Sequence, residues 1–164
     1  MVADGVHVLV ALALVLSIFR SERPEAYLVA ALAAAFPDID SYIFPTLVDL
    51  GVVHGAVWTH RGMTHSLFVG VVVVLALSYF GPWRAAAVGF LSHVTLDFVT
   101  GGVLLVAPVT AVRYGVSAGW LLLNMVASVV SVAVLLVGSR YLWVETSLDR
   151  SSSDAATGVF ERFG

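Results

Sequence analysis

Long apolar segments, separated by Pro, Gly and Arg, make up most of this sequence and restrict it to helices that bury themselves in a membrane. Pro and Gly at such junctions end helices. Of the 164 residues, 60% are hydrophobic and only 12% are charged, whereas a soluble domain is about half apolar and about a quarter charged. We therefore expect an all-α integral membrane bundle of about five helices, some of them short. The five segments are Val6–Phe19, Glu25–Phe36, Ser66–Phe80, Trp83–Val99 and Val116–Val137.

Most of these segments are shorter than a membrane crossing requires. A helix perpendicular to the bilayer needs about 20 residues, and only the fifth segment reaches that length comfortably. We expect the first two to end in the polar zone of the bilayer or to thin the membrane locally. The expected organisation is a transmembrane helical domain over residues 1–140 and a polar cytoplasmic tail over residues 141–164. Residues 37–63 and 100–115 are predicted to be loops.

The arginines predict the orientation in the membrane. If the spans alternate, Arg61 and Arg113 lie on one side and six arginines lie on the other. The positive-inside rule then places the N-terminus outside the cell and the C-terminus in the cytoplasm. The expected location is the inner (cytoplasmic) membrane, crossed several times, with the lipid bilayer as the partner. The six arginines are Arg20, Arg23, Arg84, Arg140, Arg150 and Arg162.

Two features of the composition exclude classes of function. The chain has no Cys, which rules out thiolate metal ligands, a Cys nucleophile and disulfides. Its formal net charge is −3, and nucleic-acid binding requires a basic face, so no nucleic-acid partner is expected.

Seven ionisable side chains stand among the apolar segments at positions that this topology brings to one side of the membrane. An ionisable group at the centre of a membrane helix costs about 2.5–3.5 kcal/mol, so such groups are kept mainly for function. Imidazole and carboxylate are also the usual ligands of Zn²⁺ and similar divalent metals. The sequence therefore predicts a metal site at the outer membrane face. The seven residues are His7, Asp38, Asp40, His60, His65, His93 and Asp97.

Two of the motifs lie at helix ends. His93 and Asp97 are four positions apart, so on a helix they share one face and can bind one ion. The same spacing also occurs in polar pairs that only join helices. Asp38 and Asp40, in PDID, follow the second segment, where a negative charge opposes the helix dipole and calls for a positive partner. A divalent metal would supply it, although an Asp beside a helix end is also common in ordinary turns.

The heptapeptide HRGMTHS, residues 60–66, combines two candidate ligands with one candidate anion binder. His60 and His65 flank Arg61, whose planar guanidinium suits a phosphate or a carboxylate. Arg61 is therefore expected to contact the substrate, or else to pair with an Asp of its own loop. Thr64 is expected to cap the helix that follows.

These motifs, in this order, resemble the YdjM-like inner-membrane proteins, a family of metal-dependent hydrolases distantly similar to zinc-dependent phospholipase C. The resemblance covers residues 5–110 and rests on an N-terminal His followed by PDID, HRGMTHS and HVTLD. It implies metal ligation by His7, Asp38, His65, His93 and Asp97, with His60 and Asp40 close by. We count His60 among the expected ligands.

The expected function is hydrolysis of a phosphoester or lipid-linked substrate by metal-activated water. Two or three divalent ions, with Zn²⁺ the first expectation, would generate the attacking water. Asp38 or Asp40 would orient this water as general base, and Arg61 would stabilise the charge that develops on the transferred group.

Two other functions use the same residue types. Acidic and His side chains near helix ends also line paths for metal ions or protons, although a transporter or channel would need polar residues in the inner half of the bundle as well. A non-catalytic scaffold stabilised by metal would use the same ligands, but it needs fewer acids and no arginine.

Overall fold

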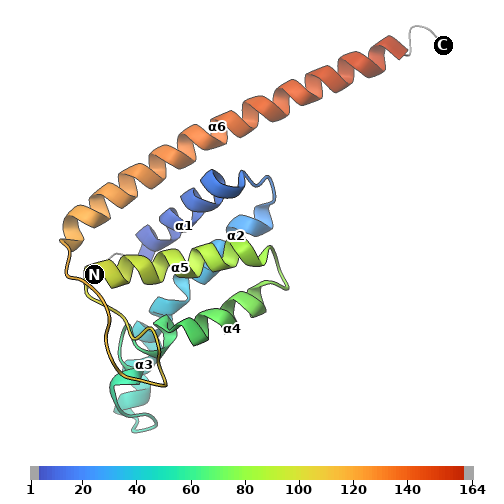
Figure 1. Cartoon of the computed structure of the whole chain (residues 1–164). Coiled ribbons are helices and arrows are strands. Elements are labelled where there is room, and N and C mark those ends of the chain that lie inside the picture. The colour runs from blue at the N-terminus through green and yellow to red at the C-terminus, as the bar shows by residue number, and fades with distance from the viewer. Residues whose placement is uncertain (1–3, 161–164) are drawn as a thin grey trace.

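The computed structural model describes residues 4–160, with side chains placed up to Leu142 and at Val144, and its regular elements in this range are all helical (Figure 1). The described residues form six α-helices; residues 20–23, 36–39 and 78–82 connect them as short turns, whereas residues 50–66 and 101–119 are longer connections. Three 3₁₀ turns lie at Pro37–Ile39, Ala56–Trp58 and Met63–His65. The helices are α1 (Asp4–Phe19), α2 (Pro24–Ala35), α3 (Asp40–Asp49), α4 (Leu67–Leu77), α5 (Trp83–Thr100) and α6 (Trp120–Phe160).

The all-α class and all five predicted helices are confirmed, as α1, α2, α4, α5 and α6. The predicted loop over residues 37–63 is wrong in part, because its first half folds as α3. This helix contains Pro45, which lacks an N–H and normally breaks a helix, so the sequence favoured a loop. The fifth helix also continues to Phe160, past the predicted boundary at 140. The last four residues of the predicted tail lie outside the described range.

Most of the bundle helices are too short to cross a bilayer upright. The 16 residues of α1 extend about 24 Å, against about 30 Å of hydrocarbon. By length and composition, Trp120–Leu142 of α6 can span a membrane alone. A second span results if α2 and residues Pro37–Asp49 form one crossing bent by 40°. The described residues thus contain one or two candidate spans.

The core lies between α2 and α5, which approach closely because their facing residues are small. Ala30 and Ala33 of α2 and Ala86 of α5 are completely buried. A Cβ atom at Gly89 would overlap the backbone of Ala30, so glycine allows the two helices to touch here. Close approach through small residues is the usual way in which membrane helices associate.

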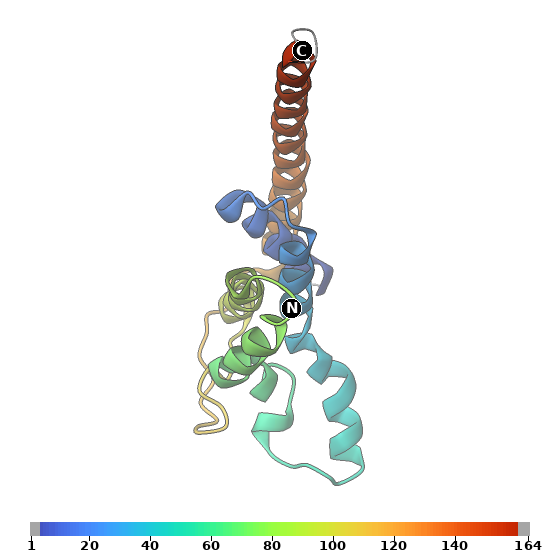
Figure 2. The ribbon, with the colours of Figure 1, turned by 90° about the vertical axis from the view of Figure 1, so that its right-hand side faces the viewer.

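Helix α1 packs against α2 and α5, and α6 packs against the other side of α1. Figures 1 and 2 both show α6 running alongside α1 and then far beyond the other helices. Gly138 of α6 lies against the side chain of Leu16, and a Cβ atom there would overlap it.

One end of this bundle carries the polar residues. It gathers the start of α1, the end of α2, the start of α4 and the end of α5. The segment between α5 and α6 folds back over this end, since the N–H of Leu104 donates to the carbonyl of Arg61 at 3.1 Å. Val103, Leu104 and Ala107 of that segment are buried, so the segment covers the polar end of the bundle.

Candidate metal centre

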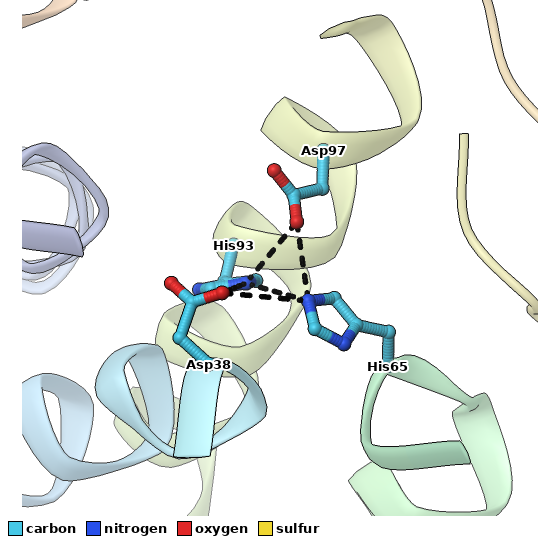
Figure 3. Close-up of side chains that lie close together, drawn as sticks. All are labelled: Asp38, His65, His93 and Asp97. Atoms are coloured by element: carbon cyan, nitrogen blue, oxygen red, sulfur yellow. Dashed lines mark hydrogen bonds and ion pairs between the residues drawn. The ribbon is translucent and has the colours of Figure 1, made fainter. Parts of the chain in front are cut away.

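Four buried donor atoms from three parts of the chain converge at this end (Figure 3). They are Oδ1 of Asp38, after α2; Nε2 of His65, before α4; and Nε2 of His93 with Oδ2 of Asp97, on α5. The two imidazole nitrogens lie 3.1 Å apart. His65 Nε2 is 3.1 Å from Asp97 and 3.7 Å from Asp38, and His93 Nε2 is 3.6 Å from each of the two carboxylates.

These separations fit the edges of a tetrahedral metal site. Zn²⁺ binds His nitrogen and carboxylate oxygen at about 2.0–2.2 Å, so neighbouring donors in a tetrahedron stand about 3.3–3.6 Å apart. The Oδ1 of Asp38 and the Oδ2 of Asp97 are buried and accept no hydrogen bond within the described residues. Buried carboxylate oxygens are normally satisfied, so both atoms have the character of metal donors.

Hydrogen bonds on the far side of each ring fix both imidazoles so that Nε2 faces inward. His93 Nδ1 lies 2.7 Å from the carbonyl oxygen of Ala34, which can only accept, so this nitrogen carries the proton. His65 Nδ1 lies 3.1 Å from the hydroxyl oxygen of Thr64, whose own proton goes to Asp40, and 3.3 Å from a carboxylate oxygen of Asp40. Two neutral rings held in this way present lone pairs to each other across 3.1 Å. Such an arrangement requires a cation or a proton between them.

The net charge of the buried cluster also indicates a cation. Asp38, Asp40 and Asp97 are buried together with one guanidinium, which leaves two negative charges uncompensated if the histidines are neutral. Burial alone lowers the pKa of His65, but ion pairing with the surrounding carboxylates of Asp38, Asp40 and Asp97 outweighs burial and raises the pKa to about 10. Without a metal the cluster therefore holds a proton on His65. A divalent cation in place of this proton would neutralise both remaining negative charges of the cluster.

Asp40 supports the centre from behind. One of its oxygens accepts hydrogen bonds from the hydroxyl of Thr64 at 2.6 Å and from the N–H of Arg61 at 3.1 Å. The other lies 2.8 Å from Nδ1 of His60. The predicted capping role of Thr64 is wrong: the N-cap of α4 is Ser66, whose hydroxyl accepts from Val69, and Thr64 is free to hold Asp40.

Arg61 is buried and points at Asp97. Its Nη2 donates to Oδ1 of Asp97 at 2.6 Å and to the hydroxyl of Thr100 at 3.2 Å. The backbone of Arg61 has φ 61°, a left-handed conformation that few non-glycine residues adopt and that turns the side chain into the site. The structure thus pairs Arg61 with an acid far along the chain, and not with one from its own loop.

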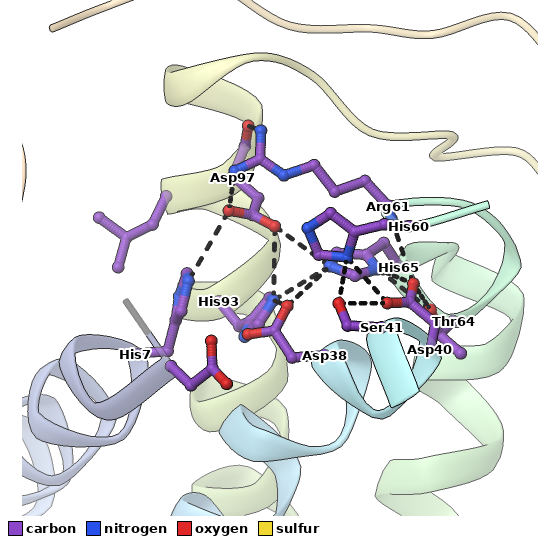
Figure 4. A network of polar contacts seen from close by, with 12 residues as sticks. His7, Asp38, Asp40, Ser41, His60, Arg61, Thr64, His65, His93 and Asp97 are labelled. Atoms are coloured by element: carbon purple, nitrogen blue, oxygen red, sulfur yellow. Dashed lines mark hydrogen bonds and ion pairs between the residues drawn. The ribbon is translucent and has the colours of Figure 1, made fainter. Parts of the chain in front are cut away.

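His7 and His60 flank the four donors on opposite sides (Figure 4). The ring of His7 stacks on that of His93 at 3.8 Å, and its Nε2 is 3.7 Å from Oδ1 of Asp97. Neither ring nitrogen of His7 has a hydrogen-bond partner among the described residues. His60 binds Asp40 and Ser41 through Nδ1 and keeps Nε2 free. With Asp38 and Asp40 it forms a second group whose donor atoms lie within 4.8 Å of one another.

All of the predicted site residues therefore meet in one network (Figure 4). The sequence did not reveal Ser41, Thr64, Thr100 or the Ala34 carbonyl as supports. Ser41 directly follows PDID and Thr64 lies within HRGMTHS, so their positions beside the candidate ligands could have indicated both. A main-chain carbonyl leaves no trace in the sequence, because every residue has one.

Comparisons with known proteins agree with the motifs. The family model described as YdjM inner membrane protein matches residues 1–155. Inner membrane protein YbcI of Escherichia coli (strain K12) is 35% identical over 89 residues, which is 48% of this chain and 49% of that protein. The aligned region thus spans about half the length of this curated relative. No solved structure gave a significant match.

Proposed function

The chain belongs to the YdjM inner membrane protein family, and from this premise we propose that it is a membrane-embedded, metal-dependent hydrolase that cleaves a phosphoester with metal-activated water. The observation that carries the proposal is the inward convergence of two imidazole nitrogens and two unpartnered carboxylate oxygens in a buried cluster with excess negative charge.

In this proposal Asp38, His65, His93 and Asp97 hold the ion. A bound Zn²⁺ supplies Lewis acidity toward water and toward a phosphoryl oxygen. Asp40 and the Ala34 carbonyl keep the two imidazoles in the tautomer that offers Nε2. Arg61 occupies one oxygen of Asp97 and leaves the other for the ion.

The general base is assigned to the carboxylate whose oxygens are not already occupied by hydrogen bonds. The oxygens of Asp40 already accept several hydrogen bonds, so we assign Asp40 a positioning role and not that of general base. Asp38 contributes one oxygen to the cluster while its second oxygen points away (Figure 3), which leaves it the carboxylate better placed to orient water. Second and third ions would use His7 with Asp97, or His60 with Asp38 and Asp40.

A metal-stabilised scaffold is the second candidate, because four protein donors suffice for a closed structural site. The surplus of His7, His60 and Asp40 around the four donors favours catalysis. A transporter is disfavoured, since Ser92 and Ser131 are the only buried polar residues in the described part of the chain outside this network and its cap Ser66. Two hydroxyls do not make a path across the bundle.

Purified full-length protein tests the proposal. We expect zinc to be retained and to support hydrolysis of bis-p-nitrophenyl phosphate, and His93→Ala to lose both. The matched control is His54→Ala, since His54 is exposed and lies outside the network. Zinc bound in full without turnover of phosphomonoesters or phosphodiesters would favour the scaffold.

A further inference from the structure

An apolar cavity of about 600 Å³ adjoins the metal centre and has no role in the ligation described above. It lies between α2, α3 and α4, and Asp38 is one of its lining residues. The same carboxylate therefore borders both the cavity and the four-donor cluster. A volume in this range is typical of pockets that hold small molecules and is too small for a protein helix.

The cavity is polar at one end only. Its polar lining residues are Asp4, Asp38 and Tyr42, and the Tyr42 hydroxyl lies 3.5 Å from a carboxylate oxygen of Asp4. Because α2 ends at the metal centre and α4 begins there, the remaining wall leads away from the metal. It reaches Leu32 on α2 and Leu77 on α4, and Leu77 is about 15 Å along α4 from its first residue.

The outer wall is open to the side that a bilayer would cover. Among its lining residues, Leu32 is 48% exposed and Ile39 is 40% exposed. In an inner membrane protein such apolar surfaces face lipid, so a hydrocarbon chain can enter sideways from the membrane.

We infer that the substrate is a lipid phosphoester with one long hydrocarbon chain, which lies in this cavity while the phosphoester reaches the metal centre beside Asp38. This inference rests on the proposed hydrolase function and adds the class of substrate. A ligand with one polar end and a long apolar remainder matches the distribution of polar residues along the wall.

A second apolar cavity provides the control. It has a volume of about 420 Å³, lies between α4 and α5, and includes Ala87 in its lining. None of the ionisable residues of the metal centre lines it. A large side chain there disturbs the same helix packing and the same lipid contacts without obstructing the path to Asp38.

The test uses full-length zinc-loaded protein in nanodiscs and two esters, dodecyl and methyl p-nitrophenyl phosphate. Ala76→Trp fills the cavity from α4, where Ala76 is exposed and tolerates a larger residue. It is expected to lower kcat/KM for the dodecyl ester at least about tenfold and to leave the methyl ester unchanged. Ala87→Trp should alter neither, and Leu32→Trp should repeat the effect from the opposite wall. Equal effects on both esters, or none, would overturn the inference and identify the cavity as a site for bulk lipid.

A binding measurement separates this inference from the proposed function. If the wild type cleaves neither ester, the hydrolase proposal fails, but radiolabelled dodecyl phosphate still reports on the cavity, with empty nanodiscs subtracted. Zinc-dependent binding that Ala76→Trp removes and Ala87→Trp retains would support the cavity as a chain site. Dodecyl phosphate binding no tighter than inorganic phosphate would exclude it.

Discussion

Arg61 donates to one carboxylate oxygen of Asp97 at 2.6 Å, while the other oxygen of the same carboxylate faces His65 at 3.1 Å. One oxygen of the Asp97 carboxylate thus binds the guanidinium of Arg61, and the other faces the position of a metal ion. The guanidinium sets the orientation of Asp97, and the orientation of Asp97 completes the four-donor cluster. Arg61 belongs to the binding of the ion as much as to any contact with substrate.

Arg61→Lys is therefore expected to weaken zinc binding about 10–100-fold, as supports of metal ligands generally do, and activity should fall in parallel. Lysine keeps the charge but loses the planar fork that reaches Asp97 and Thr100 together. Zinc affinity and turnover measured on one preparation check this. Lost turnover at unchanged affinity would instead place Arg61 on the substrate.

Asp40→Asn separates positioning from ligation. The amide keeps the shape of the side chain but provides one acceptor oxygen where the carboxylate has two, so the orientation of His65 and His60 is loosened. We expect about 10–100-fold weaker zinc binding with full occupancy restored at high zinc. Asp49→Asn, at the exposed end of α3, is the control. A lasting loss of one ion per protein would show that Asp40 is itself a ligand.

Much of this site could be predicted from the sequence, because its residues lie at helix ends, and Pro, Gly and Arg residues mark those ends in the sequence. The hairpin order α1–α2 and α4–α5 brings those ends together, so His7, Asp38, His65 and His93 were expected on one side. The partner of Arg61 could not be predicted, since Asp97 is 36 positions away and the contact depends on the left-handed turn at Arg61. Helix α3 was not predicted, because Pro45 normally breaks a helix. Burial of Phe44 stabilises α3 through tertiary packing, which the local sequence does not show.

The metal-free protein should lose stability as pH rises. The pKa of His65 in the folded protein is about 10, above its ordinary 6.5, so its proton stabilises the fold fully below about pH 6.5. This contribution is lost as pH rises through about 10. Thermal unfolding in detergent, followed from pH 6.5 to 10, should show a falling Tm for metal-free protein and a nearly constant Tm with zinc, which replaces the proton. Identical slopes with and without zinc would contradict an ion on His65.

Gly89→Val should destabilise the protein by about 1–3 kcal/mol, as overpacking usually does. A Cβ atom at this position overlaps the Ala30 carbonyl and pushes α2 away from α5. Since Asp38 follows α2 and His93 lies on α5, zinc affinity should fall as well. Gly119→Ala is the control, because nothing lies within 4 Å of a Cβ atom there. Thermal unfolding with and without zinc measures both effects.

The orientation in the membrane is predicted by the arginines and can be measured directly in a chain without Cys. The metal centre should face the outside, because Arg20 and Arg23 lie in the α1–α2 turn and Arg84 lies at the start of α5. These positions are at the opposite end of the bundle, where the positive-inside rule places the cytoplasm. Leu50→Cys provides a reporter on α3, the helix that starts at Asp40 of the network: Leu50 is 70% exposed at the end of this helix and has no part in the network. Ser152→Cys reports on the C-terminal part. In intact cells an impermeant maleimide should label Leu50→Cys and leave Ser152→Cys unlabelled until the membrane is opened. The reverse pattern would move the site to the cytoplasmic face and, with it, the side from which a lipid phosphoester must be presented.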